Sequence, residues 1–245
     1  MRILGVIPAR YASERFPGKP LADIAGKPMI QRVYEQARLA TALTDVLIAT
    51  DDARILQAAE TFHGRAVMTS STHESGTERI IEVASNLSDY DAYINIQGDE
   101  PFIAPEQINQ VADLFRKGGP QTIATLVREV TDESAMQPTS IVKVVRNTRG
   151  EALYFSRAVI PYARHTRHQP LYHHVGIYGY STLALQHISG LSPSPLEQTE
   201  GLEQLRWLEH GMTIRTAITA HESWSVDLPE DVQKVIRAAR GSHES

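Results

Sequence analysis

The first half of the chain alternates short apolar runs with longer segments in which apolar residues recur at helical spacing. The expected strands are RILGVIP near the start, DVLIAT at 45–50, RAVMTS at 65–70 and DAYINIQ at 91–97. Helices are expected from Pro28, after Asp51 and Asp52, from about Thr77, and from about Pro105 to Arg116. Such alternation indicates a parallel sheet wound by right-handed crossovers.

Beyond about Thr122 the expected strands follow one another more closely. They are QTIATLV, SIVKVVRN, ALYFSR and VGIYGYS, followed by one helix near 196–210, a strand TIRTAIT and a last helix from Pro229. Closely spaced strands suggest an antiparallel extension. The expected fold class is therefore α/β, a Rossmann-like three-layer fold with a mostly parallel sheet and an inserted antiparallel β region, in one domain over residues 1–245.

Composition excludes several kinds of function. The chain has no cysteine, which rules out disulfides and zinc–thiolate sites. Its net charge of −5 and the lack of a basic run argue against nucleic acid as a partner. No signal peptide and no apolar run of about 18 residues is found, so no membrane insertion and a cytoplasmic location are expected. The terminal GSHES is polar and is expected to fray.

The loop IPARYASERFPGKP at 7–20 gathers positive charge after the first expected strand, with Arg10, Arg15 and Lys19. In open parallel sheets, ligands bind at the carboxyl ends of the strands. No G-x-G-x-x-G follows the strand, and AGKP at 25–28 lacks the other residues of a P-loop. Phosphate binding here would depend on arginine, lysine and backbone N–H groups. The alternative is a solvated loop without a function.

A second polar stretch, NIQGDEP at 95–101, ends another expected strand. Gly98 allows close backbone approach, and Asp99 and Glu100 place two carboxylates at the edge of the sheet. Oxygen ligands of this kind suit Mg²⁺, which binds one or two carboxylates together with substrate phosphates. A structural turn is the alternative, and together with the cationic loop the stretch favours a nucleotide site.

These stretches, with several later ones, resemble the 3-deoxy-manno-octulosonate (Kdo) cytidylyltransferase family. The similarity is collinear from residue 3 to about 235 and includes SGTER at 75–79, FSRAVIP at 155–161, HVGIYGY at 174–180, SPLEQTEGLEQLR at 194–206 and VDLPED at 226–231. The first motif is shared with other sugar nucleotidyltransferases, whereas the later ones are specific to this family. Tyr162 stands where the family often has tryptophan, and SVDLPED replaces GVDTPED, which bears on the geometry of the last loop.

The resemblance implies transfer of CMP from CTP to the anomeric hydroxyl of Kdo, with release of pyrophosphate, by a Mg²⁺-dependent homodimer. It implies a CTP-binding half over about 1–120, a sugar-binding and dimerisation region over about 121–220, and a metal-binding loop with a closing helix over 221–245. Lys19, Asp99 and Arg10 would be catalytic, and Asp99 with Asp227 would bind the metal. Glu100 is expected to be structural. The expected substrate-binding residues are Arg15, Ser75, Arg79, Gln97, Arg157, His174, Tyr178, Glu203 and Gln204. Of the adjacent His173 and His174, one is expected to be a bystander, because neighbouring strand residues point to opposite faces.

Other functions stay open at this point. The nearest is a cytidylyltransferase for another acid sugar, such as sialate or 8-amino-Kdo. A non-catalytic nucleotide-sugar-binding protein or a glycosyltransferase of related architecture is a different class. Lys19, Asp99 and Asp227 argue against a non-catalytic protein, and GDEP is not the Asp-x-Asp motif of a glycosyltransferase.

Overall fold

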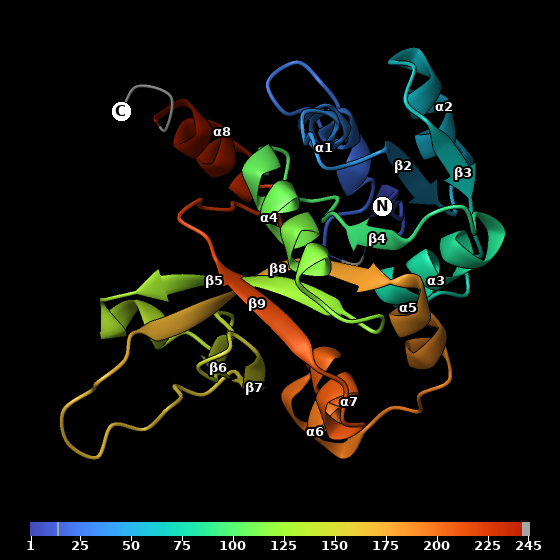
Figure 1. Cartoon of the computed structure of the whole chain (residues 1–245). Helices are drawn as coiled ribbons and strands as arrows, with labels where there is room; N and C mark the ends of the chain where they lie inside the picture. Colours follow the sequence, from blue (N-terminus) through green and yellow to red (C-terminus); the bar gives the residue numbers. More distant parts are fainter. Residues whose placement is uncertain (14, 242–245) are drawn as a thin grey trace. The chain divides into compact units, whose positions relative to one another are not determined.

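The structure is a computed structural model that describes residues 1–13 and 15–241, and the end of GSHES, 242–245, lies outside the described residues. The chain forms two compact units (Figure 1). The first unit comprises residues 1–109 and the segment from Glu222 onward, and the second comprises residues 110–221. Each unit is described separately below.

The first unit contains a parallel sheet. Its strands are β1 (Ile3–Ala9), β2 (Asp45–Thr50), β3 (Ala66–Met68) and β4 (Ala92–Asn95), in the order β3-β2-β1-β4. In β2 and β4 nearly every residue is buried, as expected for strands covered on both faces. The carboxyl ends of β1 and β4 lie side by side, since Val6 pairs with Asn95. The segments that follow these two strands therefore start at the same edge of the sheet.

Helices of the first unit lie between its strands along the chain, except the last, which follows the second unit. They are α1 (Met29–Arg38), α2 (Ala53–Thr61), α3 (Gly76–Asn86) and α8 (Asp231–Gly241), with a 3₁₀ turn η1 (Lys19–Leu21) before α1. Asp52 and Ser75 are the N-caps of α2 and α3, each accepting a backbone N–H of the first turn. The chain leaves this unit within α4 (Pro105–Arg116).

A small apolar cluster holds the last segment of the chain against the first. Val226, Val235 and Ile236 pack with Ile24 and Met29, and Trp224 lies against the same cluster. Because Val226 is fully buried, the residue after it has a fixed place at the edge of the sheet.

The second unit is mainly antiparallel. Its strand β5 (Ile123–Val130) pairs antiparallel with β8 (Leu171–Ser181) and parallel with β9 (Ile214–Ile218). The strands β6 (Lys143–Arg146) and β7 (Ala152–Ser156) pair with each other, and β6 also pairs with β8. The helices are α5 (Thr182–Ser189), α6 (Pro195–Glu200) and α7 (Gln204–Glu209), with a 3₁₀ turn η2 (Glu133–Met136).

The expected α/β class, with a mostly parallel sheet and an antiparallel region, is confirmed. The single helix expected near 196–210 is wrong, because Gly201 adopts a left-handed conformation (φ 62°) that ends α6 before α7 begins. Helix α5 was not expected, and the last helix begins at Asp231 rather than at Pro229. Pro28 precedes α1 as its N-cap instead of lying in its first turn.

Within the described part of the chain, no helix combines the length and the apolar character that crossing a membrane requires.

Candidate functional site

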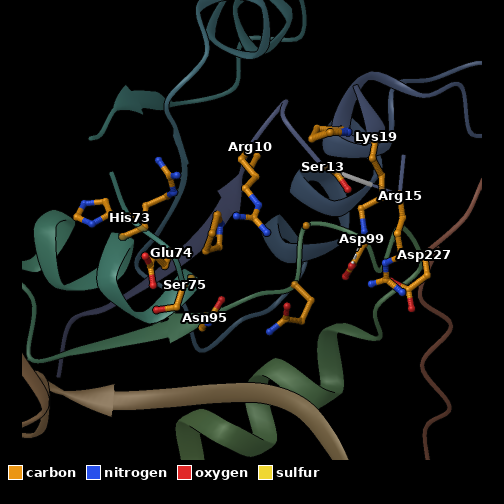
Figure 2. A pocket seen from close by; sticks show the side chains of 17 residues that line it. Arg10, Ser13, Arg15, Lys19, His73, Glu74, Ser75, Asn95, Asp99 and Asp227 are labelled. Carbon is orange, nitrogen blue, oxygen red and sulfur yellow. Dashed lines mark hydrogen bonds and ion pairs between the residues drawn. The ribbon is translucent and has the colours of Figure 1, made fainter. Parts of the chain in front are cut away.

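A cavity of about 290 Å³ opens at the carboxyl edge of the sheet of the first unit. It is lined by the end of β1, the loop that follows, the start of α3, the end of β4 with the GDEP turn, and Asp227 (Figure 2). Of the residues expected at the site, the structure brings eight to this one cavity: Arg10, Arg15, Lys19, Ser75, Arg79, Gln97, Asp99 and Asp227. Residues from four segments of the sequence therefore meet where the parallel sheet predicts a ligand site.

The loop after β1 is shaped by its own backbone and by Tyr11. The Tyr11 carbonyl accepts the N–H groups of Ser13 and Gly18, and Gly18 takes a positive φ of 74°. The Tyr11 ring leaves no spare room there, because a Cβ on Gly18 would lie 3.1 Å from it. The Arg54 guanidinium stacks on the same ring, 3.3 Å from its centroid. This folded loop delivers Lys19 to the start of η1.

Lys19 connects two distant segments inside the cavity. Its Nζ donates to Asp99 Oδ2 (2.8 Å) and to the Val226 carbonyl (3.0 Å). The Val226 N–H in turn donates to the Asp99 carbonyl (2.9 Å), which ties the last loop to the GDEP turn. Arg15 donates to Asp227 Oδ1 (3.2 Å). Each of the two carboxylates thus has one cation from the first loop beside it.

The GDEP turn is pressed against β1. A Cβ on Gly98 would lie 2.7 Å from the Pro8 carbonyl oxygen, so only glycine fits without a backbone shift. The neighbouring Glu100 is buried, and its pKa is raised to about 7 by burial and by the nearby Asp99 carboxylate, against a hydrogen bond from Ser223. Asp99 faces the cavity, whereas Glu100 does not line it.

Asp227 does not cap the last helix. The carboxylate of Asp231 accepts the N–H groups of Asp227 (3.2 Å) and Leu228 (3.0 Å) and so fixes the turn before α8. The Asp227 carboxylate is thereby left to face Arg15 and the cavity.

Two further expected residues lie at the start of α3. Ser75 is its N-cap and accepts the Glu78 N–H. Arg79 is buried, and its guanidinium donates to Asp51 Oδ2 (3.0 Å) and to Thr69 Oγ1. Both residues line the cavity while also supporting the local structure.

The expected sugar-binding residues lie in the second unit. Arg157 donates from its guanidinium to the carbonyls of Glu200, Thr139 and Gly201, at 2.7, 3.0 and 3.2 Å. The rings of His174 and Tyr178 lie 5.2 Å apart, and Tyr178 meets Trp207 edge-on. Glu203 is the N-cap position of α7 and Gln204 is its buried first residue.

His173 and His174 are both half-buried, and His174 has the larger pKa shift of the two. Burial lowers the pKa of His174 to about 3, with a smaller effect of His173, and Thr125 Oγ1 lies 3.1 Å from its Nε2. Burial also raises the pKa of Tyr178. Both side chains are therefore neutral at ordinary pH, which suits hydrogen bonding to hydroxyl groups rather than to charged ones.

Sequence reasoning missed several residues that line the cavity. They are Ser13, His73, Glu74 and Asn95. His73 and Glu74 immediately precede SGTER, and Asn95 is the first residue of NIQGDEP, so each adjoins a stretch that the sequence had marked. Their position beside a motif was the available signal.

A divalent cation can bind in the cavity only if the carboxylates there have oxygen atoms available to it. Asp99 and Asp227 each use one oxygen toward a cation, and among the residues that the structure describes the other oxygen has no hydrogen-bond partner. No group of three or more His, Cys, Asp or Glu residues suited to a metal occurs among the described residues. The donor set thus fits Mg²⁺, which takes few carboxylates and fills its shell with water and phosphate.

Comparisons with known proteins agree with one another. A family model described as cytidylyltransferase matches residues 4–214. The 3-deoxy-manno-octulosonate cytidylyltransferase of Parabacteroides distasonis is 48% identical over 96% of this chain and 97% of that protein. The protein of the same name from Myxococcus xanthus is 46% identical over 98% of both chains. The 8-amino-3,8-dideoxy-manno-octulosonate cytidylyltransferase of Shewanella sp. is 49% identical over 96% of this chain and 97% of that protein.

Solved structures show the same relationship. The structure of CMP:2-keto-3-deoxy-manno-octonic acid synthetase complexed with CTP matches with a TM-score of 0.94 and 44% identity, covering 99% of this chain and 100% of that one. A glucose-1-phosphate thymidylyltransferase from Bacillus anthracis, at 16% identity and a TM-score of 0.64 over 97% of this chain and 95% of that one, shares the fold.

Proposed function

This chain belongs to the cytidylyltransferase family, and from that membership we propose that it transfers CMP from CTP to the anomeric hydroxyl of Kdo and releases pyrophosphate. The observation that carries the proposal is the meeting of Arg10, Arg15 and Lys19 with Asp99 and Asp227 in one cavity. Relatives of similar length that share nearly half of the residues bear the name of this activity.

The chemistry requires positioning more than a reactive side chain. The sugar hydroxyl oxygen attacks the α-phosphorus, its proton is lost, and the bond from that phosphorus to the bridging oxygen breaks as pyrophosphate leaves. No protein nucleophile is needed. Arg10 and Lys19 would hold the triphosphate and offset the negative charge that develops on the leaving group. Arg15, which bonds to Asp227, would contribute less.

Asp99 and Asp227 would hold Mg²⁺ through the carboxylate oxygens that face the cavity. When bound, this ion supplies positive charge beside the phosphates and orients oxygen atoms for the displacement. Lys19 then keeps Asp99 in place through its 2.8 Å bond, while its second bond to the Val226 carbonyl holds the loop that carries Asp227.

The sugar acid would be recognised by Arg157, His174, Tyr178, Glu203 and Gln204, with Ser75, Arg79 and Gln97 on the nucleotide side. A planar carboxylate is bound well by a guanidinium. The Arg157 guanidinium donates to three carbonyls, which fix its orientation. The first unit, which includes α8, would thus bind CTP and metal, and the second unit would bind the sugar and carry the surface of a homodimer. A cytoplasmic location belongs to the same proposal.

Kdo is not the only acid sugar to consider. The relative named for 8-amino-3,8-dideoxy-manno-octulosonate is 49% identical, as similar as those named for Kdo. The two sugars differ at one carbon, so 8-amino-Kdo is the second candidate substrate.

Pyrophosphate release tests the proposal directly. The purified protein is assayed with CTP and Mg²⁺ and with Kdo, 8-amino-Kdo or sialate, each at the same concentration. Release with Kdo above the other two sugars supports the proposal, and release mainly with 8-amino-Kdo supports the second candidate. Absence of release with all three sugars, for a protein that still binds CTP, would overturn both.

A further inference from the structure

Asn95 has an unusual environment for an amide. It is the last residue of β4, and its side chain is only 6% exposed. Its Oδ1 is buried and has no hydrogen-bond partner. Buried polar atoms are almost always paired, and leaving one unpaired costs stability. The Asn95 amide oxygen therefore lacks the hydrogen-bond donor that a buried carbonyl oxygen normally has.

The amide lies at the cavity, against the start of α3. Asn95 and Gly76 both line the cavity. A Cβ on Gly76 would come within 3.2 Å of Asn95 Nδ2 and 3.5 Å of Pro8 Cγ, so glycine here gives the amide its room. Rotation of the terminal amide torsion, which is broad, exchanges oxygen and nitrogen. Either end of the amide can thus be turned toward a bound molecule.

Charge divides the cavity into two ends. Figure 2 shows His73, Glu74, Ser75 and Asn95 on one side of Arg10, and Lys19, Arg15, Asp99 and Asp227 on the other. The second end suits phosphates and a cation. At the first end the Arg79 guanidinium is paired with Asp51 (3.0 Å) and Glu74 adds a negative charge, so this end is less favourable for a phosphate than the second. A neutral amide is better matched to a neutral polar group.

We infer that Asn95 is a specificity-determining residue that hydrogen-bonds the nucleoside part of CTP through its side-chain amide. This inference rests on the proposed function, because it assigns the end of the cavity away from Lys19 to the nucleoside. The nucleoside has two groups of suitable chemistry, the polar edge of the base and the ribose hydroxyls. Both offer uncharged donors or acceptors that can form a hydrogen bond with an amide side chain.

Binding of nucleotides without sugar tests the inference separately from turnover. Calorimetry compares CTP, UTP and 2′-deoxy-CTP on the wild type, Asn95→Ala and Asn95→Asp, the last of which keeps an acceptor but loses the donor. Asn109→Ala is the matched control, because the Asn109 amide oxygen accepts the Ala42 N–H (2.9 Å) and does not line the cavity. Asn95→Ser and Gly76→Ala, which crowds the amide, extend the series should Asn95→Ala not fold.

We expect Asn95→Ala to weaken CTP binding about tenfold. If the amide hydrogen-bonds the base, the preference for CTP over UTP should fall in the variants while the preference for CTP over 2′-deoxy-CTP stays. If it hydrogen-bonds the ribose, the preference for CTP over 2′-deoxy-CTP should fall while the preference for CTP over UTP stays. Unchanged preferences in the Asn95 variants, or the same change in Asn109→Ala, would overturn the inference. A wild type that binds CTP but turns over no sugar would instead count against the proposed function and leave the binding comparison intact.

Discussion

At the scale of residues, the Lys19 side chain makes hydrogen bonds to two separate segments of the cavity. Its ammonium group bonds to both Asp99 and the Val226 carbonyl. Under the proposed function it would support the metal site and add charge where the leaving group becomes more negative. Lys19→Ala should lower turnover on the order of 10²-fold, with a smaller effect on the apparent KM for Kdo. Steady-state pyrophosphate release measures both constants. Lys27→Ala, which removes an ion pair with Glu35 outside the cavity, is the matched control, and equal losses in both variants would count against a catalytic Lys19.

Asp227 and Asp231 should differ in what their loss does. Asp227→Asn removes a carboxylate from the cavity and should raise the Mg²⁺ concentration needed for turnover, with little change in Tm. Asp231→Ala removes the acceptor of two N–H groups before α8 and should lower the stability by about 1–2 kcal/mol. Mg²⁺ titrations and thermal melts of both variants check this. Asp99→Asn combined with Asp227→Asn should cost little more activity than the worse single change, because in the proposed site both carboxylates would hold the same ion.

His174 links the stability of the second unit to pH. The folded chain keeps its imidazole neutral down to about pH 3, whereas the unfolded chain takes up a proton below its ordinary pKa of 6.5. Stability is thus complete above pH 6.5 and is lost as the pH falls toward 3, by about 2 kcal/mol at pH 5. Denaturant unfolding at pH 7 and pH 5 should show a smaller difference for His174→Gln than for the wild type. The exposed His210 provides the control, since His210→Gln should keep the wild-type difference.

At the scale of elements, Gly201 decides where one helix ends and the next begins. Its φ of 62° is unfavourable for a residue with a Cβ, although nothing closer than 3.8 Å would obstruct that atom. Gly201→Ala should therefore lower the stability by about 1 kcal/mol through its backbone alone. Gly190 ends α5 with an ordinary φ of −93°, so Gly190→Ala should cost little. Thermal melts of the two variants give the comparison, and equal Tm values would show that the left-handed turn is not what matters at Gly201.

The same glycine shows what the sequence could and could not predict. The helix from Pro105 to Arg116 was predicted with both ends, because a proline start and an apolar period agree with each other. The single helix near 196–210 was wrong, since a lone Gly201 inside a helical period does not reveal its φ. Helix α5 follows β8 directly, because Ser181 is both the last residue of the strand and the N-cap of the helix. Without a loop between them, no turn residues mark where the strand ends and the helix begins.

The cavity was more predictable than its details. Lys19 and Asp99 were marked because charged residues follow the ends of two expected strands, and the resemblance to the Kdo cytidylyltransferase family gave them their expected roles. Asn95 was missed because a neutral amide at the end of a buried strand looks like part of a turn. That its side-chain oxygen is buried without a partner follows only from the tertiary structure, where the start of α3 packs beside β4.

For the whole molecule, the two units should respond to different substrates. CTP with Mg²⁺ should slow hydrogen exchange in the first unit, around 8–20, 73–79, 95–99 and 224–228, because these segments line the cavity or adjoin it. Kdo added to that complex should extend protection to the second unit, around 157 and 174–178. Exchange measured by mass spectrometry with each ligand separately and with both tests this. Protection by CTP alone that is as strong in β8 as in β1 would contradict this division between the units.

The hydrogen bonds from Lys19 to Asp99 and to the Val226 carbonyl join an early and a late segment of the chain, so they cannot both form until the late segment has been synthesised. A nascent chain that has emerged as far as residue 221 already holds the basic loop and the GDEP turn, yet it lacks the loop with Asp227 and the apolar residues of α8 that pack on Ile24 and Met29. If the proposed function holds, the nucleotide site would stay open on one side until residues 222–241 have emerged and folded onto it. A chain that stalls at residue 221 would then hold the basic loop and the GDEP turn but would not consume CTP.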